Sequence, residues 1–411
     1  MVEILKNTLM LVISGSLFSV PLLIFLPKNN HLANTRGFNM SLLFSKIDLG
    51  PLKLQNRLVM APMTRNRAIN NNPNALMEKY YTQRATAGLI ITEGTSPSPN
   101  GLGYPRIPGI FSKIQIDGWK RITNSVHAKG ARIFLQLMHC GRIVHPLNMP
   151  KNTRALAPSA ISATGEMYTD SQGMQPLPIP EAMTAEDIKN TIADFVRAAK
   201  NAINAGFDGI ELHSANGYLL EQFIRPNSNQ RTDDYGGPIE NRARFVLEVV
   251  EAVNNAIGKN KVGIRLSPFG TFNDMPLYDD MQADYLYLAE QLNLRNLLYI
   301  HLVDHSAMGM PSVPASIKDT IRQVFKGILI LSGGYDNTRA NSDLGNKKCD
   351  LIAVGRPFIA NPDLPKRWEI GAAINTPDMN TFYTADAKGY TDYPALIQSL
   401  IERDEYFTQY E

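Results

Sequence analysis

The stretch that decides the fold is GFDGIELHSANGYLLEQFIRPNSNQRTDDYGG, residues 206–237 of a chain of 411 residues. It begins as an apolar run and then places His213, Asn216 and Tyr218 within six residues. Hydrogen-bonding side chains that follow a rigid buried strand are well placed to bind a ligand. What these three side chains do depends on the sheet to which the strand belongs.

Seven further apolar runs repeat this pattern after Met40, and segments with helical periodicity lie between them. The eight runs are residues 57–62, 89–94, 132–139, 207–214, 262–268, 297–304, 328–334 and 351–357. Segment 185–206 is one of the predicted helices, since Ile188, Phe195 and Ala199 fall on one face. Segment 239–258 is another, and Gly237-Pro238 is a favourable entry to it.

Near-continuous apolar strands that alternate with helices indicate a parallel sheet buried on both faces. Eight such units close a (β/α)8 barrel. An open doubly wound sheet is the alternative, but it calls for a glycine-rich first turn, and residues 63–72 contain no glycine. We therefore predict an α/β fold of the TIM-barrel type. Segment 47–58, IDLGPLKLQNRL, is expected to form a hairpin that plugs the amino-terminal mouth.

Active sites of such barrels lie where the strands end and the βα loops begin. The loops after the last two strands contain Gly333, Gly334, Gly355 and Arg356. Backbone N–H groups freed by glycine, together with a guanidinium group, suit a phosphate dianion. These two loops are the usual phosphate site of TIM barrels. The sequence therefore predicts a phosphorylated ligand.

A long connection follows the third strand of the predicted barrel. Residues 141–184 show no clear helical pattern and are rich in proline, alanine and serine. Loops much longer than about 15 residues inside a compact domain are usually functional or disordered. Because this loop leaves from the predicted catalytic face, we expect it to form a lid or a wall of the pocket.

Charge and cysteine content exclude several classes of protein. The formal net charge is only +3, whereas nucleic-acid binding usually requires a clustered basic surface. Two cysteines, Cys140 and Cys349, are too few for a disulfide framework or a four-thiolate zinc site. A reducing compartment fits best. His139, His301 and His305 are not completed by an H-x-H motif or a carboxylate pair, so no metal site is predicted.

The amino-terminal 39 residues form a leader with a separate character. Residues 8–26 carry no charge and are flanked by Lys6 and Lys28. We place the domain boundary between this apolar leader, 1–39, and the barrel, 40–411. Three interpretations stay open: an upstream extension before a start at Met40, a membrane anchor, which needs about 20 apolar residues, or a cleaved signal peptide. The distribution of positive charge around residues 8–26 favours a cytoplasmic barrel.

Several motifs resemble the Old Yellow Enzyme family, in particular its N-ethylmaleimide reductase-like branch, from about residue 43 to 394. The motifs are APMTR (61–65), TEGT (92–95), GLGYPRIPGI (101–110), LQLMHCGRIVHP (135–146), ELHSANGYLLEQFIRPNSNQRTDDYGGPIENR (211–242), GIRLSP (263–268), AVGRPFIANPDL (353–364) and GYTDYP (389–394). The resemblance implies an FMN-binding (β/α)8 barrel that reduces activated alkenes with NAD(P)H. The central motif is highly specific, whereas GIRLSP alone is weak.

The resemblance also assigns cofactor-binding roles to residues of this chain. Thr64 matches a hydrogen-bond partner of flavin O4, Gln136 a partner of the pyrimidine edge, and Arg265 the cation beside N1 and O2. Gly94 matches a backbone contact to the ring edge. The complete implied set is Ala61, Pro62, Met63, Thr64, Gly94, Gln136, Arg265, Gly333, Gly334, Gly355 and Arg356.

By the same resemblance, His213 and Asn216 bind the carbonyl or nitro oxygen of the substrate, and Tyr218 is the proton donor. These roles answer what the polar cluster of segment 206–237 is for. The implied substrate pocket consists of Tyr104, Met138, Asn273 and Tyr383. Many relatives carry tryptophan in place of Met138, which is smaller and more flexible, so we expect a wider pocket that accepts bulkier β-substituted alkenes.

Several of these residues also allow a purely structural role. Arg265 could simply pair with Glu211, and Tyr104 and Tyr383 could simply pack. A barrel glycosidase using Glu93 or Glu211 would require a second carboxylate about 5–10 Å away, and the seventh strand ends in SGG without one. A non-catalytic flavin-binding or membrane-tethered module is the third class. Partners are expected to be small activated alkenes, with no nucleic acid and with membrane contact only through residues 8–26; the chain is a monomer or a homodimer.

Overall fold

The chain divides into two units, Met1–Asn39 and Met40–Glu411. The computed structural model describes residues 10–13, 16–19 and 41–396. In the first unit, strands β1 (Met10–Ile13) and β2 (Ser16–Ser19) pair in antiparallel orientation. The rest of the predicted apolar segment 8–26 lies outside the described residues. Within the described ranges, no helix combines the length and the apolar composition that a membrane crossing requires.

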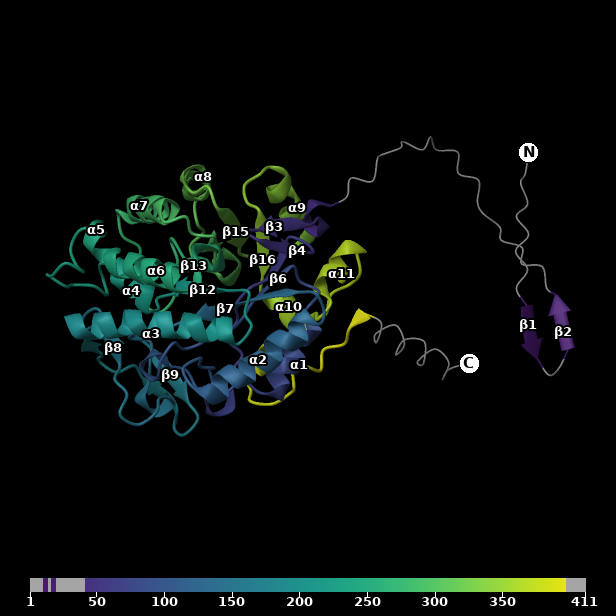
Figure 1. The fold of residues 1–411 in the computed structure, drawn as a ribbon, viewed down its shortest axis with the longest axis horizontal. Helices are drawn as coiled ribbons and strands as arrows, with labels where there is room; N and C mark the ends of the chain where they lie inside the picture. The colour runs from purple at the N-terminus through teal and green to yellow at the C-terminus, as the bar shows by residue number, and fades with distance from the viewer. Residues whose placement is uncertain (1–9, 14–15, 20–40, 397–411) are drawn as a thin grey trace. The chain divides into compact units, whose positions relative to one another are not determined.

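Eight parallel strands of the second unit close into a barrel (Figure 1), which confirms the predicted (β/α)8 fold. Around the barrel they are β5 (Leu58–Met60), β6 (Leu89–Ile91), β7 (Arg132–Leu137), β12 (Gly209–Ser214), β13 (Val262–Leu266), β14 (Tyr299–Val303), β15 (Ile328–Ser332) and β16 (Leu351–Val354). Each lies within its predicted run. Most runs continue past the strand, and their last residues belong to the βα loop where the site is built.

Helices surround this barrel (Figure 1). They are α1 (Ala75–Gln83), α2 (Lys113–His127), α3 (Ala185–Asn204), α4 (Leu219–Ile224), α5 (Ile239–Arg242), α6 (Arg244–Ile257), α7 (Met281–Leu294), α8 (Ala315–Val324), α9 (Asn337–Gly345), α10 (Arg356–Ala360) and α11 (Leu364–Glu369). Helix α3 begins with a capping box between Thr184 and Asp187 and buries Ile188 and Phe195. The single helix predicted over 239–258 is wrong in detail, because α5 and α6 are separated at Ala243, which itself keeps nearly helical dihedral angles.

The predicted hairpin plug is present as strands β3 (Ile47–Leu49) and β4 (Leu52–Leu54). Leu49 and Leu54 are fully buried in one cluster with Leu89, Leu298 and Leu351. Leu89 and Leu351 begin strands β6 and β16, and Leu298 immediately precedes β14. The hairpin therefore closes the amino-terminal mouth of the barrel and leaves the carboxyl-terminal mouth for ligands.

The connection after β7 contains more regular structure than its composition indicates. It includes β8 (Leu156–Ala157), β9 (Glu166–Thr169), β10 (Gly173–Pro176) and β11 (Glu181–Ala182). Strands β9 and β10 form an antiparallel hairpin, and β8 pairs with β11 in parallel orientation. Tyr168 and Met174 are exposed and Thr169 is buried, so the sequence of β9 and β10 lacks the alternation of apolar and polar residues that marks a strand. In Figure 1, β8 and β9 lie at the opposite side of the unit from β3 and β4.

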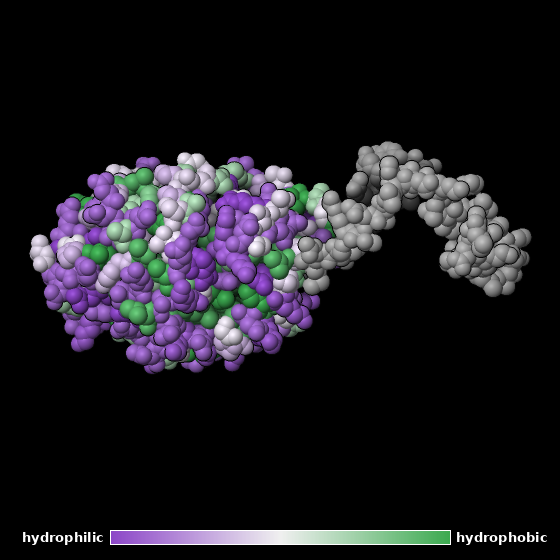
Figure 2. Space-filling view, turned by 90° about the horizontal axis from the view of Figure 1, so that it is seen from above, coloured by the Kyte–Doolittle hydropathy of each residue, from purple (hydrophilic) through white to green (hydrophobic). Residues whose placement is uncertain are grey.

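Short 3-10 helices complete the described fold: η1 (Leu42–Phe44), η2 (Ile69–Asn71), η3 (Pro99–Gly101), η4 (Pro146–Asn148), η5 (Lys259–Lys261), η6 (Ser306–Met308) and η7 (Met379–Thr381). The face shown in Figure 2 is mostly hydrophilic, and its hydrophobic residues gather in separate small patches. The apolar side chains of the strands are instead buried on both faces of the sheet, as a parallel barrel requires.

Candidate active site

A cavity of about 900 Å³, the main cavity, is built from residues at the carboxyl ends of the barrel strands. Of the predicted site residues, it is lined by Pro62, Thr64, Tyr104, Gln136, Met138, His213, Asn216, Tyr218, Arg265, Asn273 and Tyr383. Gln136, His213 and Arg265 come from the adjacent strands β7, β12 and β13, and His213 is directly opposite Arg265 in the register. The parallel barrel thus brings together side chains that are far apart in the sequence.

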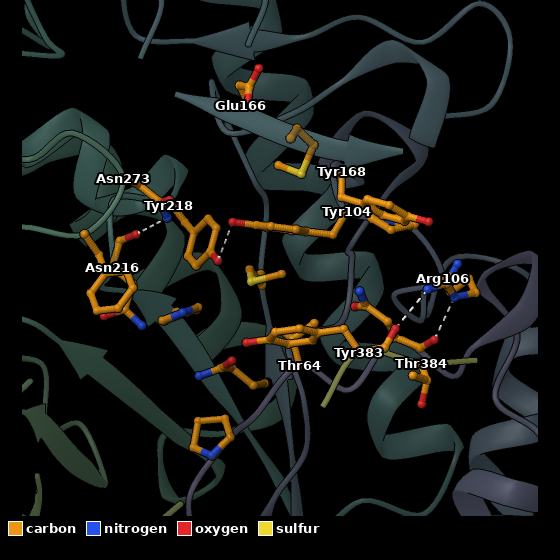
Figure 3. A pocket seen from close by; sticks show the side chains of 18 of the residues that line it. Thr64, Tyr104, Arg106, Glu166, Tyr168, Asn216, Tyr218, Asn273, Tyr383 and Thr384 are labelled. Carbon is orange, nitrogen blue, oxygen red and sulfur yellow. Dashed lines mark hydrogen bonds between the residues drawn. The ribbon is translucent and has the colours of Figure 1, made fainter. Parts of the chain in front are cut away.

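Asn216 is held in a fixed orientation at one end of the main cavity. It has a left-handed φ of 59°, which asparagine tolerates better than most residues. Its backbone N–H donates to Ser267 Oγ at 2.8 Å, and its carbonyl accepts from Asn273 Nδ2 at 2.7 Å (Figure 3). His305 Nε2 lies 2.8 Å from Asn216 Oδ1. Because the imidazole N–H occupies the amide oxygen, the NH2 group of Asn216 is available as a donor.

Tyr218 and Tyr104 point toward each other across the cavity (Figure 3). Their hydroxyl oxygens are 3.1 Å apart, and their rings meet edge to face with centroids 6.2 Å apart. Burial raises the pKa of Tyr218 above its ordinary value, and burial also raises that of Tyr104. Both phenols are therefore protonated at neutral pH.

His213 is neutral at the same pH. Burial lowers its pKa well below 6.5, with Arg265 as the next cause. Its ring centroid lies 5.0 Å from that of Tyr218. Among the described residues, His213 Nδ1 has no hydrogen-bond partner. A neutral imidazole carries one N–H, so His213 can donate one hydrogen bond without adding a charge to the cavity.

The inner end of the cavity is formed by Gln136 and Arg265. Both are nearly fully buried, and Arg265 Nε has no hydrogen-bond partner within the described part of the chain. Glu211, the expected alternative partner of Arg265, instead accepts hydrogen bonds from Gln136, Tyr299 and His301. Buried polar groups are normally paired, so the guanidinium group of Arg265 is a candidate donor to a ligand.

A second cavity of about 600 Å³ adjoins the first, since both are lined by Pro62, Thr64, Asn216, Arg265 and Tyr383. The predicted residues that line it in addition are Ala61, Met63, Gly333, Gly334, Gly355 and Arg356. A Cβ atom on Gly333, where φ is 134°, would lie 2.4 Å from the Asp304 carbonyl oxygen. The Arg356 guanidinium is held at this loop by a bond from Nη2 to the Ala307 carbonyl, 3.0 Å long. The predicted phosphate-site residues therefore share one compartment.

Gly94 is the one predicted site residue that lines neither cavity. It lies behind Met138, whose Sδ is 2.5 Å from the position that a Cβ on residue 94 would occupy. Met138 is 1% exposed and packs with Leu102, Ile107 and Cys140. The direct ring contact expected of Gly94 remains a prediction, whereas its contact with Met138 is a feature of the structure.

Sequence reasoning missed several residues of the walls. Arg106 donates from Nε to the Asn66 carbonyl and from Nη2 to the Tyr383 carbonyl, and Nη1 pairs with Asp170. It thereby connects three separate loops; Figure 3 shows Arg106 beside Tyr383 at one side of the cavity. Further lining residues are Glu166, Met167, Tyr168, Phe272, Asn380, Thr384 and Ala385. The position of Arg106, two residues after Tyr104 in a motif already assigned to the pocket, was the available signal.

The two carboxylates considered for glycoside hydrolysis do not face the cavities. Glu93 and Glu211 are at most 1% exposed, and neither lines either cavity. Glu93 accepts from the backbone N–H of Arg65 and lies 3.2 Å from the Tyr81 hydroxyl. In the part of the chain that the structure describes, no group of three His, Cys, Asp or Glu side chains could hold a metal ion.

The geometry fits FMN. A glycine-rich compartment with a guanidinium suits the phosphate, and a connected larger cavity has room for the ring system. Arg265, with its unpartnered Nε, and the amide of Gln136 are suited to the polar edge of a flavin. The hydrogen-bond donors and the two cavities of this chain are thus sufficient to indicate FMN.

Comparison with known proteins agrees with this fit. The family model described as the NADH:flavin oxidoreductase / NADH oxidase family matches residues 42–375. The 12-oxophytodienoate reductase 1 of Oryza sativa subsp. japonica is 44% identical over 360 residues, which cover 86% of this chain and 93% of that protein. A probable flavin mononucleotide-dependent alkene reductase of Leishmania infantum is 42% identical over 352 residues, with coverages of 84% and 95%.

Solved structures give the same result. Morphinone reductase superposes with a TM-score of 0.85 at 45% sequence identity and covers 88% of this chain and 98% of its own. A structure of morphinone reductase in complex with tetrahydroNAD has a TM-score of 0.82 at 46% identity, with coverages of 86% and 97%. The chain therefore belongs to the NADH:flavin oxidoreductase / NADH oxidase family, the Old Yellow Enzyme family.

Proposed function

We propose that the chain is an FMN-dependent ene-reductase. His213 and Asn216 bind the electron-withdrawing group of an activated alkene, and Tyr218 donates a proton to the α carbon of that alkene. The observation that carries this proposal is the convergence of a neutral imidazole, a fixed amide and a protonated phenol on one cavity. Reducing an activated C=C bond requires a hydride on the β carbon and a proton on the α carbon. Bound FMN, reduced by NAD(P)H, supplies the hydride.

His213 and Asn216 act on the substrate oxygen. Negative charge builds on a carbonyl or nitro oxygen as the β carbon is reduced. Two N–H donors aimed at that oxygen stabilise this charge, and the loss of one such donor typically lowers the rate about 100-fold or more. The bonds of Asn216 to Ser267, Asn273 and His305 fix its donor before the substrate arrives.

Tyr218 supplies the proton. A positioned general acid contributes about 10²–10⁴-fold to a rate. Its raised pKa keeps the phenol protonated across the neutral range. The Tyr104 hydroxyl, 3.1 Å from the Tyr218 hydroxyl, orients this group, and Tyr104 is itself partly buried.

The cofactor contacts belong to the same proposal. Thr64 would bind flavin O4, Gly94 would contact the ring edge, and Gln136 and Arg265 would hold the pyrimidine edge. Gly333, Gly334, Gly355 and Arg356 would bind the phosphate. The supporting observation is that all of these except Gly94 line the two adjoining cavities.

The decisive experiment separates the two half-reactions in Tyr218→Phe. Stopped-flow spectroscopy of flavin reduction by NADPH should give nearly the parent rate. Reoxidation of the reduced enzyme by cyclohexenone should slow by about 10²–10⁴-fold, because the general acid is missing. Tyr104→Phe is the matched control and should lose far less. Parent-like reoxidation of the Tyr218→Phe enzyme would show that another group donates the proton.

We further propose bulky cyclic enones as the substrate class. The main cavity of about 900 Å³ would hold the flavin ring system together with the substrate, and Met138 rather than a bulkier side chain lines it. Two relatives are named for 12-oxophytodienoate and for morphinone, both larger than simple enones. A screen of enones, maleimides, nitroalkenes and nitrate esters of graded size should show kcat/KM rising with bulk. Preference for the smallest acceptors would contradict this assignment.

The cellular setting is a proposal of its own. We place the barrel in the cytoplasm, where NAD(P)H is supplied, as a monomer or homodimer. Residues 8–26 would provide the contact with a membrane if they are retained as an anchor. Mass spectrometry of the native amino terminus, combined with fractionation into membrane and supernatant, tests this. Light scattering of the purified holoenzyme gives the oligomeric state.

A further inference from the structure

A carboxyl group lies in the barrel beneath the main cavity, outside the catalytic roles given above. Glu211, on β12, has 0% exposure. Gln136 Nε2 lies 2.8 Å from its Oε1, and the Tyr299 hydroxyl and His301 Nδ1 lie 3.1 and 2.9 Å from its Oε2. Three side chains from two other strands therefore converge on one carboxyl group, and only Gln136 of these three lines the main cavity.

The barrel is built to allow these contacts. Tyr299 and His301 belong to β14, which is separated from β12 by β13. At the position of β13 that pairs with both Glu211 and Tyr299 the residue is Gly263. A Cβ on Gly263 would lie 2.1 Å from Cζ of the Tyr299 ring. The glycine therefore leaves the space through which the Tyr299 phenol reaches Glu211.

The bond from Gln136 to Glu211 determines which way the amide faces. The NH2 group of Gln136 donates to Glu211 Oε1, because a carboxyl oxygen without a proton only accepts hydrogen bonds. The amide oxygen of Gln136 is consequently left for the cavity. A flavin ring presents one N–H on its pyrimidine edge, at N3, and that group needs an acceptor. Without Glu211, the amide could turn and present a donor instead.

The carboxylate also opposes the charge of Arg265. Burial lowers the pKa of Arg265, and Glu211 is the first of the groups that raise it. A fixed cation near a bound pyrimidine ring would favour the anionic reduced flavin, whereas a buried anion near the same ring would disfavour it. Glu211 therefore offsets part of the effect of Arg265.

We propose that Glu211 is a positioning residue with two separable effects. Its hydrogen bond to the Gln136 NH2 group turns the Gln136 oxygen toward flavin N3, and its negative charge lowers the flavin reduction potential. The inference rests on the proposed placement of the pyrimidine edge against Gln136 and Arg265. It assigns to Glu211 no contact with substrate and no proton transfer.

Two single substitutions separate the effect of side-chain length from the effect of charge. Glu211→Asp keeps the charge but shortens the side chain by one methylene group. The FMN affinity of the apoprotein should therefore fall about tenfold, while the reduction potential of the bound flavin should stay near that of the parent. Glu211→Gln keeps the side-chain length and removes the charge. The ratio of reduced to oxidised bound flavin at a fixed potential should therefore rise about tenfold, which equals about 30 mV for two electrons. Flavin fluorescence titration and dye-coupled reduction measure these quantities.

Tyr299→Phe is the control, because it disturbs the same buried cluster without removing the charge. It should leave the potential nearly unchanged, and circular dichroism of each apoprotein reports folding. Equal shifts of potential in Glu211→Gln and Tyr299→Phe would mean that packing, not charge, is responsible, and would overturn the electrostatic part. If Glu211→Gln does not fold, Glu211→Met is the second variant that removes the charge: a potential raised by about 30 mV supports the charge effect, and a parent-like potential overturns it.

A double-mutant cycle with Gln136→Ala tests the route through Gln136. If Glu211 acts on FMN through this amide, Glu211→Asp should cost no further affinity in the Gln136→Ala background. Additive losses would overturn the positioning role. Unchanged FMN affinity in Gln136→Ala alone would have a different meaning, because it would show that the proposed placement of the flavin is wrong.

Discussion

At the scale of single residues, the site depends on side chains whose hydrogen bonds are already made before substrate binds. Asn216 has its N–H, its carbonyl and its amide oxygen engaged by Ser267, Asn273 and His305. Only its NH2 group remains for a ligand. Donors that need no reorganisation during the reaction stabilise developing charge most effectively, and a loop residue with a left-handed φ gains this property from its neighbours.

Met138 shows how one residue can set the shape of the pocket. Its thioether occupies the space next to Gly94, and a Cβ at residue 94 would lie 2.5 Å from Sδ and 2.6 Å from Cε. The size of the side chain at residue 94 therefore limits the conformations that the Met138 side chain can adopt. Methionine is flexible, so the wall that it forms can adapt to substrates of different width.

We predict that Met138→Trp narrows the substrate range. The indole is larger and stiffer, so kcat/KM for β-substituted enones of increasing bulk should fall progressively, by about tenfold for the bulkiest. Cyclohexenone should be affected least. Gly94→Ala should act in the same direction, because it pushes the Met138 side chain into the cavity. Equal relative rates for Met138→Trp and the parent across the series would refute the role of Met138.

At the scale of elements, the cavity wall is assembled from loops that Arg106 connects. Its guanidinium reaches the hairpin β9–β10 through Asp170, the loop after β5 through the Asn66 carbonyl, and the carboxyl-terminal loop through the Tyr383 carbonyl. Only 15% of the Arg106 side chain is exposed, compared with 49% for Asp170. The bond to the Asn66 carbonyl is part-buried, whereas the bond to the Tyr383 carbonyl and the ion pair are both exposed, and Asp170 takes part only in the ion pair.

This difference predicts unequal effects of two substitutions. Asp170→Asn removes an ion pair with an exposed partner, which contributes about 0–1 kcal/mol, so KM for a bulky enone should rise a few-fold at most. Arg106→Met also removes both backbone bonds and should raise KM about tenfold or more. Steady-state kinetics with Lys113→Met as a surface control checks this. Similar KM values for the two cavity variants would show that the backbone bonds do not hold the wall.

The elements differ in how far they could be predicted. The eight strands were predictable because each is a buried apolar run, and the residues at their ends follow from the barrel rule. The hairpin β9–β10 was not, since Tyr168 and Met174 are exposed while Thr169 is buried, so apolar residues do not mark its buried face. Arg106 was missed because its partners, Asn66, Asp170 and Tyr383, are brought together only by the tertiary fold. The contact between Gly94 and Met138 likewise joins neighbouring strands β6 and β7 beyond their ends.

At the scale of the whole molecule, charges buried in the fold make its stability depend on pH. Burial raises the pKa of Glu93 from 4.5 to about 7. Between these values the folded chain binds more protons than the unfolded chain, so stability falls as pH rises. Arg65 and Tyr81, the bonded neighbours of Glu93, only partly offset the cost of burying its charge.

We therefore predict a specific change for Glu93→Gln. The amide cannot ionise, so the urea midpoint of the variant should improve relative to the parent between pH 5 and pH 8, whatever its absolute value. Most of the relative gain should come below about pH 7. Glu240→Gln, at an exposed position, is the control and should show no such trend. A constant difference between Glu93→Gln and the parent would show that Glu93 does not titrate in this range.

The closed barrel also makes stability depend on the cofactor, and the phosphate compartment predicts which flavin stabilises it. A ligand at 100 times its Kd adds about 2.7 kcal/mol to the folded state. FMN should therefore raise the melting temperature of the apoprotein more than riboflavin does at equal concentration.

Arg356→Gln removes a donor from the phosphate compartment. It should weaken FMN binding by about ten- to a hundredfold, with little effect on riboflavin binding. Arg197→Gln removes the same charge from an exposed helix and should change neither flavin. Equal losses for both flavins in Arg356→Gln would mean that Arg356 supports the fold and not the phosphate.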